Sequence, residues 1–304
     1  MPDIPPHFEL VFQIEQEMFG MEWQKVKNGC YTSFADRQET MQKFNIELCT
    51  RLVDELGWAA VPALMYAEDL DHVHAITRLK DAVGDRALVF SFSSEGVFWM
   101  PTGNEIMDFT VMLFERPDEM HAKARARCEA AKELSKRQID AGVDFIVQNT
   151  DFGFNQGPFI SPKHFGEFVT PYMTEIVGYI HDLNTPVILH SDGDLRVILD
   201  QIYSTGVDGY QSVDPQGNMD IKIVREQYPD WLLMGNVACN LLQDTDEQKI
   251  RDAVRYCMNY GGIGEKYIFS TSNCIFAGMP PESYQIMLDE YDFLCKKGSE
   301  NVCA

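Results

Sequence analysis

The segment best suited to chemistry is the polar run at residues 190–194 (HSDGD), which closes the apolar stretch 186–190 (PVILH). A histidine and an acid two positions apart at a strand end point to nearly the same side, so His190 and Asp192 could face one ion or substrate. Imidazole is a metal ligand and a proton carrier near neutral pH. A plainer alternative stays open, in which Asp192 or Asp194 caps the next helix.

Cys274 is the second candidate, because it follows the apolar run 266–271 (KYIFST) and does not lie inside an apolar face. A free cysteine is most often a small buried hydrophobe, and that interpretation stays open. If Cys274 faces His190, a thiolate, an imidazole and a carboxylate come together as a zinc set, with three protein ligands and an open fourth position. The spacing alone does not establish this, because the residues belong to separate strands.

Two further acids follow apolar runs. Glu95 comes after residues 87–92 and precedes a glycine and an aromatic pair, so it could be a metal ligand, a substrate contact or an exposed loop charge. Asp151 stands in the equivalent position after residues 144–149. Together with His190 and Asp192, Glu95 is a candidate catalytic residue.

The elements that must position these residues are short apolar runs that alternate with longer helical patterns, which is typical of βα units and a parallel sheet. The predicted strands are 59–66, 87–92, 144–149, 186–190, 207–213, 231–237 and 266–271. The predicted helices are 69–83, 104–115, 118–141, 163–183, 194–204, 218–227, 245–260 and 281–297.

This alternation predicts an α/β protein with one (β/α)8 TIM-barrel domain over residues 1–304, in which residues 1–56 form a mostly helical N-terminal extension. Seven strands have good signals. The eighth should lie in the first 35 residues, where 26–34 is the only, weak candidate.

In such a barrel the carboxyl ends of the strands open onto one shared crevice, so the residue after each strand is a site candidate. This rule adds polar residues that could bind a cofactor or donor: Asn149, Asp151, Gln211, Asn236 and Asn273. Aromatic residues near strand ends would suit a flat apolar ligand: Phe98, Trp99, Phe152, Phe154, Tyr210 and Phe276. Strand-end polar residues also often do no more than cap helices, and aromatic residues are often plain core.

Composition narrows the function classes. The chain has 25 Lys and Arg against 47 Asp and Glu, a net charge of −22, which argues against binding nucleic acid or an anionic membrane. The eight cysteines are scattered, without CxxC, so a disulfide scaffold is not expected. We see no signal peptide and no apolar stretch near the roughly 20 residues of a membrane span, so we expect a cytoplasmic protein.

Four stretches of the chain resemble the uroporphyrinogen decarboxylase superfamily. They are 157–172 (GPFISPKHFGEFVTPY), 187–194 (VILHSDGD), 235–237 (GNV) and 272–282 (SNCIFAGMPPE). The resemblance runs from about residue 86 to the end and implies a (β/α)8 barrel. True uroporphyrinogen decarboxylases hold the substrate carboxylates with an N-terminal arginine-rich segment of the form RQAGR. The first 50 residues here offer only Arg37 beside lysines, which argues against that activity.

The other branch of the superfamily is the corrinoid-linked methyltransferases, whose zinc motif is HxC with a distal cysteine. His190 matches the histidine and Cys274 the distal cysteine, while Asp192 stands in place of the first cysteine. The resemblance therefore implies zinc bound by His190, Asp192 and Cys274. Glu95, from its place after an apolar run, is a further candidate ligand. A carboxylate is a harder and less electron-donating ligand than a thiolate. With an aspartate in place of the cysteine, the zinc is expected to polarise an oxygen or nitrogen atom and not to activate a thiol.

The expected function is zinc-dependent transfer of a methyl group from a small donor, such as a methoxylated aromatic, to the cobalt of a corrinoid (cobalamin) carried by a partner protein. The expected partners are that donor and the corrinoid-binding protein, and a homodimer stays open. One alternative is a metal-independent decarboxylase, a lyase of the uroporphyrinogen type. Another is a barrel that binds a ligand without catalysis.

Overall fold

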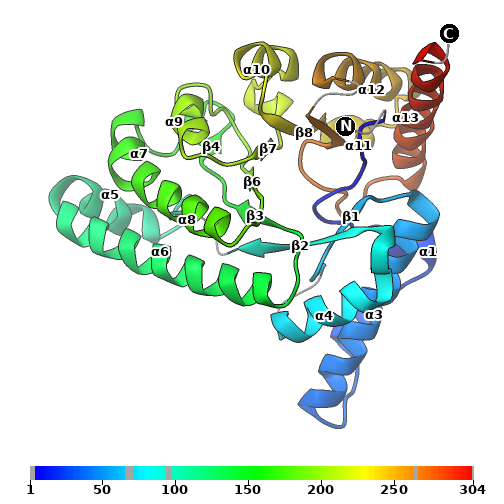
Figure 1. Cartoon of the computed structure of the whole chain (residues 1–304), viewed down its shortest axis with the longest axis horizontal. Coiled ribbons are helices and arrows are strands. Elements are labelled where there is room, and N and C mark those ends of the chain that lie inside the picture. The colour runs from blue at the N-terminus through cyan, green and yellow to red at the C-terminus, as the bar shows by residue number, and fades with distance from the viewer. Residues whose placement is uncertain (1–3, 66–70, 94–96, 263–265, 303–304) are drawn as a thin grey trace.

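A computed structural model describes residues 4–65, 71–93, 97–262 and 266–302, with side chains as far as residue 296. Its centre is a curled sheet of seven strands that pair in parallel (Figure 1). In their order across the sheet these are β1 (Ala60–Pro62), β2 (Leu88–Ser93), β3 (Phe145–Asn149), β6 (Val187–His190), β7 (Gly209–Gln211), β8 (Leu232–Val237) and β9 (Tyr267–Thr271). Each of the seven lies within or at the edge of a predicted run, so the predicted barrel architecture is confirmed.

Helices cover the outside of the sheet (Figure 1). Ser161 starts one of them by accepting a bond from the backbone of His164, with Pro162 at the first helical position. The helices are α1 (Glu15–Phe19), α2 (Trp23–Lys27), α3 (Phe34–Leu56), α4 (His72–Val83), α5 (Glu105–Glu115), α6 (Pro117–Asp140), α7 (Pro162–Phe168), α8 (Thr170–Asp182), α9 (Leu199–Ser204), α10 (Ile221–Gln227), α11 (Cys239–Asp244), α12 (Glu247–Gly261) and α13 (Pro281–Val302). A small hairpin follows β3 and is made of β4 (Gly153–Phe154) and β5 (Gly157–Pro158).

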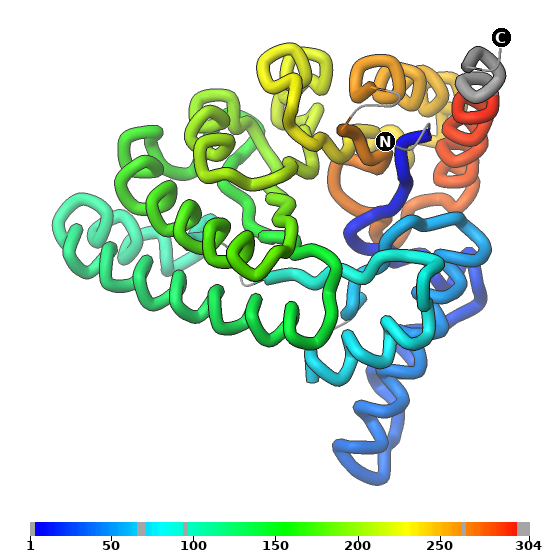
Figure 2. The backbone as a smooth tube through the Cα atoms, in the orientation of Figure 1, coloured from blue at the N-terminus to red at the C-terminus, as the bar shows by residue number. Residues whose placement is uncertain are grey.

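The eighth place in the barrel is filled by the extended N-terminal segment 6–13. His7 forms a parallel bridge with Phe269 of β9, and its carbonyl accepts a 2.8 Å bond from the backbone of Ala59, directly before β1. Figure 2 shows this blue segment running beside the orange C-terminal part of the barrel. The weak candidate 26–34 was wrong, because it contains the end of α2, a loop and the start of α3.

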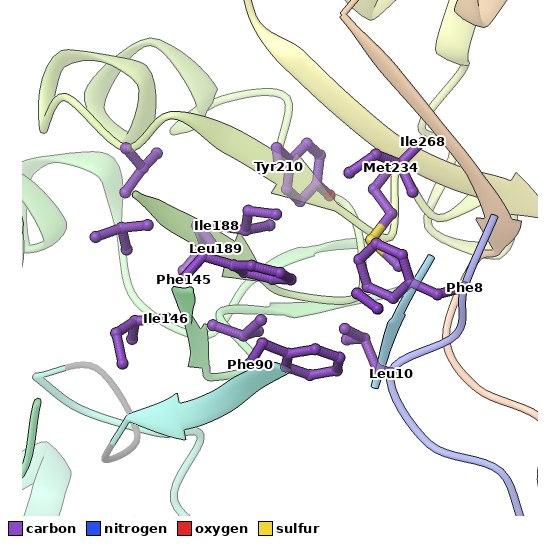
Figure 3. Close-up of a cluster of buried hydrophobic side chains, with 14 of the residues drawn as sticks. Phe8, Leu10, Phe90, Phe145, Ile146, Ile188, Leu189, Tyr210, Met234 and Ile268 are labelled. Carbon is purple, nitrogen blue, oxygen red and sulfur yellow. The ribbon is translucent and has the colours of Figure 1, made fainter. Parts of the chain in front are cut away.

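The barrel interior is packed with side chains and is not a channel. Phe90 and Phe145, paired between β2 and β3, stack with ring centroids 5.1 Å apart. Phe8 and Leu10 of the N-terminal segment join them, together with residues from β6 to β9 (Figure 3). Because the interior is filled, any reaction chamber must lie at the strand ends.

Candidate metal and active site

Three potential metal ligands meet at the carboxyl ends of β3 and β6. His190 is the last residue of β6 and is buried, and Asp192 follows it by two positions. Asp151 follows β3, the neighbouring strand, by two positions. One donor atom from each lies within 4.8 Å of the other two, and His190 Nε2 is 3.6 Å from Asp151 Oδ1. The structure thus brings together three residues that the sequence analysis named at strand ends: His190, Asp192 and Asp151.

Both oxygens of the Asp192 carboxylate are held by neighbours. Ser212 Oγ donates to Oδ1 at 2.7 Å, and Asn273 Nδ2 donates to Oδ2. Burial raises the pKa of Asp192, whereas His190 and the bond from Ser212 lower it. The nearby Asp151 carboxylate raises the pKa of Asp192 further, because two carboxylates close together repel each other.

Gln211, at the end of β7, connects His190 to the β9 end. It is fully buried and pairs in register with His190. Its Oε1 contacts His190 Nδ1, and its Nε2 donates to the carbonyls of Thr271 and Asn273, each at 3.4 Å. The amide that was expected to bind a ligand is therefore fully engaged within the protein.

Close backbone packing fixes the loops that carry these acids. A Cβ added to Gly193 would lie 2.3 Å from the carbonyl oxygen of Gly153, in the β4 segment after Asp151. A Cβ added to Gly217 would lie 2.2 Å from the carbonyl carbon of Gly193. Since real contacts are never this short, the three loops can approach each other this closely only because residues 193 and 217 are glycines.

A cavity of about 230 Å³ opens beside Asp192. It is also lined by Asn273, Cys239 and Phe276, and its described lining contains no Lys or Arg. A space of this size beside a metal group could admit a small donor molecule. Phe276 is the one predicted aromatic residue that lines it.

Cys274 lies half-buried after β9. Burial, with a smaller effect of the nearby Cys239 thiol, raises the pKa of Cys274 to about 12. Among the residues that the structure describes, its sulfur is not one of the donor atoms that meet at His190. In the structure Asp151 occupies the third position in that group.

The other predicted residues are placed differently. Asn149 pairs in register with His190 and is exposed at the mouth. Asn236 is turned away, since its amide donates to the Val213 carbonyl and accepts from Cys257 of α12. Glu95 lies outside the described residues.

The predicted aromatic residues do not form one binding surface. Phe152 and Tyr210 are fully buried, and Tyr210 stacks on Trp231. Phe98 and Trp99 line a separate cavity of about 320 Å³, where the Arg127 guanidinium lies 3.8 Å from the centre of the Trp99 ring. Some of these aromatic residues therefore belong to the hydrophobic core, and others line a cavity away from Asp192.

Ser212 and Cys239 were not predicted. Ser212 directly follows the last residue of β7, so the strand-end rule that found Gln211 could have included it. Its φ of 106° places it in a conformation that residues other than glycine rarely adopt, a feature concentrated at functional sites. Cys239 begins α11 and carries no local signal of its proximity to Cys274.

A second group of possible ligands is Cys128, Glu129 and Glu175 on the outer helices. Glu175 is already paired with Arg125 at 2.5 Å and Lys132 at 2.7 Å. These pairs explain the group as a surface ion-pair network, so it is not a site candidate.

The parallel barrel, with polar residues at the carboxyl ends of its strands, is the architecture of a known protein family. The family model described as uroporphyrinogen decarboxylase (URO-D) matches residues 59–292. The chain belongs to this family. No helix in the described part of the chain is long and apolar enough to cross a membrane.

Individual relatives are distant. Uroporphyrinogen decarboxylase from Sulfurimonas denitrificans is 25% identical over 194 residues, which cover 61% of this chain and 52% of that protein. Uroporphyrinogen decarboxylase from Herminiimonas arsenicoxydans is 25% identical over 252 residues, 79% of this chain and 66% of that protein. The matched regions therefore span between half and two thirds of these relatives.

Among solved structures, a methyltransferase from Methanosarcina mazei superposes with a TM-score of 0.75. The match covers 97% of this chain and 95% of that chain at 15% sequence identity. At this identity the similarity shows a shared fold over nearly the whole length.

Proposed function

We propose that the protein is a zinc-dependent methyltransferase that moves a methyl group from a small donor to the cobalt of a corrinoid carried by a partner protein. The observation that carries the proposal is the convergence of His190, Asp192 and Asp151 at the barrel mouth. The fold shared with the methyltransferase from Methanosarcina mazei supports it. A methoxylated aromatic is the donor class that we propose to test first.

The donor set fits a zinc ion. Imidazole nitrogen and carboxylate oxygen are both zinc ligands, and a catalytic zinc site uses three protein ligands and keeps a fourth position open. Such an ion, when bound, acts as a Lewis acid on the heteroatom that carries the donor methyl. His190 and Asp192 are ligands in every version of this proposal, and the versions differ in the third ligand. Asp151 is the third ligand in the described geometry. The alternatives are Cys274, which the family resemblance implies, and Glu95, which follows an apolar run in the sequence.

The chain's own residues prepare the site. Ser212 and Asn273 hold the two oxygens of Asp192, and the glycine contacts keep the Asp151 and Asp192 loops at a fixed separation. The cavity beside Asp192 gives the donor a place next to the ligand group. The corrinoid protein would approach the open mouth, where the acidic surface would orient it.

The second candidate is a decarboxylase, which the names of the sequence relatives favour. Porphyrinogen carboxylates need cations, however, and the described lining of the cavity beside Asp192 contains none. This absence is why we place the lyase second.

The test begins with metal analysis of protein purified without chelator, for which we expect about one zinc per chain. The protein is then mixed with reduced cobalamin and a series of methoxylated aromatics and simple methyl donors, and methyl-cobalt formation is followed by its absorbance. Release of carbon dioxide from uroporphyrinogen, with no methyl transfer from any donor, would replace the proposal with the lyase.

A further inference from the structure

The orientation of the Gln211 side chain is determined by its neighbours. Its Nε2 faces the carbonyl oxygens of Thr271 and Asn273. A carbonyl oxygen can only accept a hydrogen bond, so the NH2 end of the amide must face this pair. The carbonyl end of the same amide, Oε1, therefore faces His190 Nδ1.

This orientation fixes the proton of His190. Because Oε1 has no proton to give, Nδ1 must be the donor, and a neutral imidazole then carries a lone pair on Nε2. That Nε2 lies 3.6 Å from Asp151 Oδ1, with an Asp192 oxygen in the same group. Three electron-rich atoms thus point at one place, an arrangement that a cation between them would stabilise.

We propose that Gln211 is a positioning residue that holds His190 in the tautomer able to bind a metal through Nε2. The inference rests on the proposed function for the identity of that metal. Gln211 also reaches the second part of the site, because the Asn273 residue whose carbonyl it binds donates its side chain to Asp192. One buried amide therefore positions both His190 and the residue that holds Asp192.

Two variants separate this role from packing. Gln211→Glu keeps an acceptor for Nδ1–H, whereas Gln211→Leu keeps volume and removes the acceptor. Nitrogen NMR of the metal-free protein, at a pH where His190 is neutral, should show Nδ1–H in the wild type and in Gln211→Glu. Gln211→Leu should lose this preference, because a free imidazole favours the Nε2–H form. Zinc affinity, measured by competition with a chelating dye, should fall roughly 10–100-fold in Gln211→Leu, the range for loss of a partner that orients a histidine ligand. It should stay within about tenfold in Gln211→Glu.

Gln148→Leu is the matched control. Gln148 is also a fully buried strand glutamine, on β3, which is separated from β7 by β6, but it has no hydrogen-bond partner among the described residues. This variant should leave both the tautomer and the zinc affinity unchanged. Thermal melts establish that each variant is folded.

Wild-type His190 with its proton on Nε2 would overturn the inference, and so would folded Gln211→Leu binding zinc as tightly as the wild type. The NMR measurement needs no metal, donor or corrinoid. If the protein binds no zinc, the proposed zinc-dependent function is wrong. The NMR result then still decides whether Gln211 sets the tautomer of His190.

Discussion

Asn273 reaches from the end of β9 to Asp192 at the end of β6 and donates to its Oδ2, across 81 positions of sequence. The other oxygen of Asp192 accepts from Ser212 at 2.7 Å. Each carboxylate oxygen has more than one lone pair, so both remain able to bind an ion. The orientation of Asp192 is therefore set by two residues, Ser212 after β7 and Asn273 after β9.

Replacing Asp151 tests whether it is a zinc ligand. Asp151→Asn keeps the shape of the side chain but removes the charge, so zinc affinity should fall by more than the roughly 10–100-fold typical of residues that only orient a ligand. Isothermal titration with zinc measures this. Asp194→Asn is the control, because Asp194 pairs with Arg196 and should not affect the metal. Equal zinc affinity in wild type and Asp151→Asn would remove Asp151 from the ligand set.

The third ligand can also be identified from a cobalt spectrum. With Asp151 as that ligand, Co²⁺-loaded protein should lack the near-ultraviolet band of a thiolate bound to cobalt, and Cys274→Ser should have the same spectrum as the wild type. A thiolate band that disappears in Cys274→Ser and persists in Cys239→Ser would make Cys274 the ligand in place of Asp151.

Glu9 should make stability depend on pH. Burial raises its pKa from 4.5 to about 8, against the opposing bonds from Thr271. Between these values the unfolded chain releases the proton and the folded chain keeps it, so this group lowers the free energy of unfolding as pH rises, by up to about 1.4 kcal/mol per pH unit. Glu9→Gln has no such proton and should become more stable relative to the wild type from pH 5 to pH 8.

Urea unfolding at pH 5, 6.5 and 8 measures this difference. Glu226→Gln, at an exposed position, should follow the wild type at each pH. Parallel curves for Glu9→Gln and the wild type would show that Glu9 ionises normally in the folded protein.

Gln148→Leu should stabilise the fold. Both polar atoms of this amide are buried without a hydrogen-bond partner, and such a group costs about 1–3 kcal/mol. Leucine has a similar size and no desolvation cost, so the midpoint of urea unfolding should increase without a change in slope. A lower midpoint would mean that the amide is satisfied by a bound water.

His190 and Asp192 could be predicted from sequence because their signal is local: an apolar strand that ends in polar residues. Asn236 shows the limit of that rule, since its amide binds Val213 and Cys257 and not the group at the mouth. Side chains alternate along a strand, so a strand-end residue can belong to either face. The face depends on contacts between distant segments, which spacing along the chain does not contain.

The N-terminal strand was missed for a related reason. Phe8, Leu10 and Phe12 alternate with His7 and Glu9, which is a strand pattern, but it is short and follows two prolines. The segment is held by partners such as Phe269, more than 250 positions away. Its structure is therefore determined by tertiary contacts and only weakly by local propensity.

This closure affects how the chain folds as it is synthesised. This segment is synthesised before β1 to β9, and it can form its bridge to β9 only after Phe269, more than 250 residues later, has emerged from the ribosome. Until then, the edge of this segment that pairs with β9 would be open, and open strand edges promote association between chains. The large sequence separation of these contacts also favours slow folding. Fusions or deletions that constrain the first 13 residues should therefore reduce the yield of folded protein while every residue around His190 is intact.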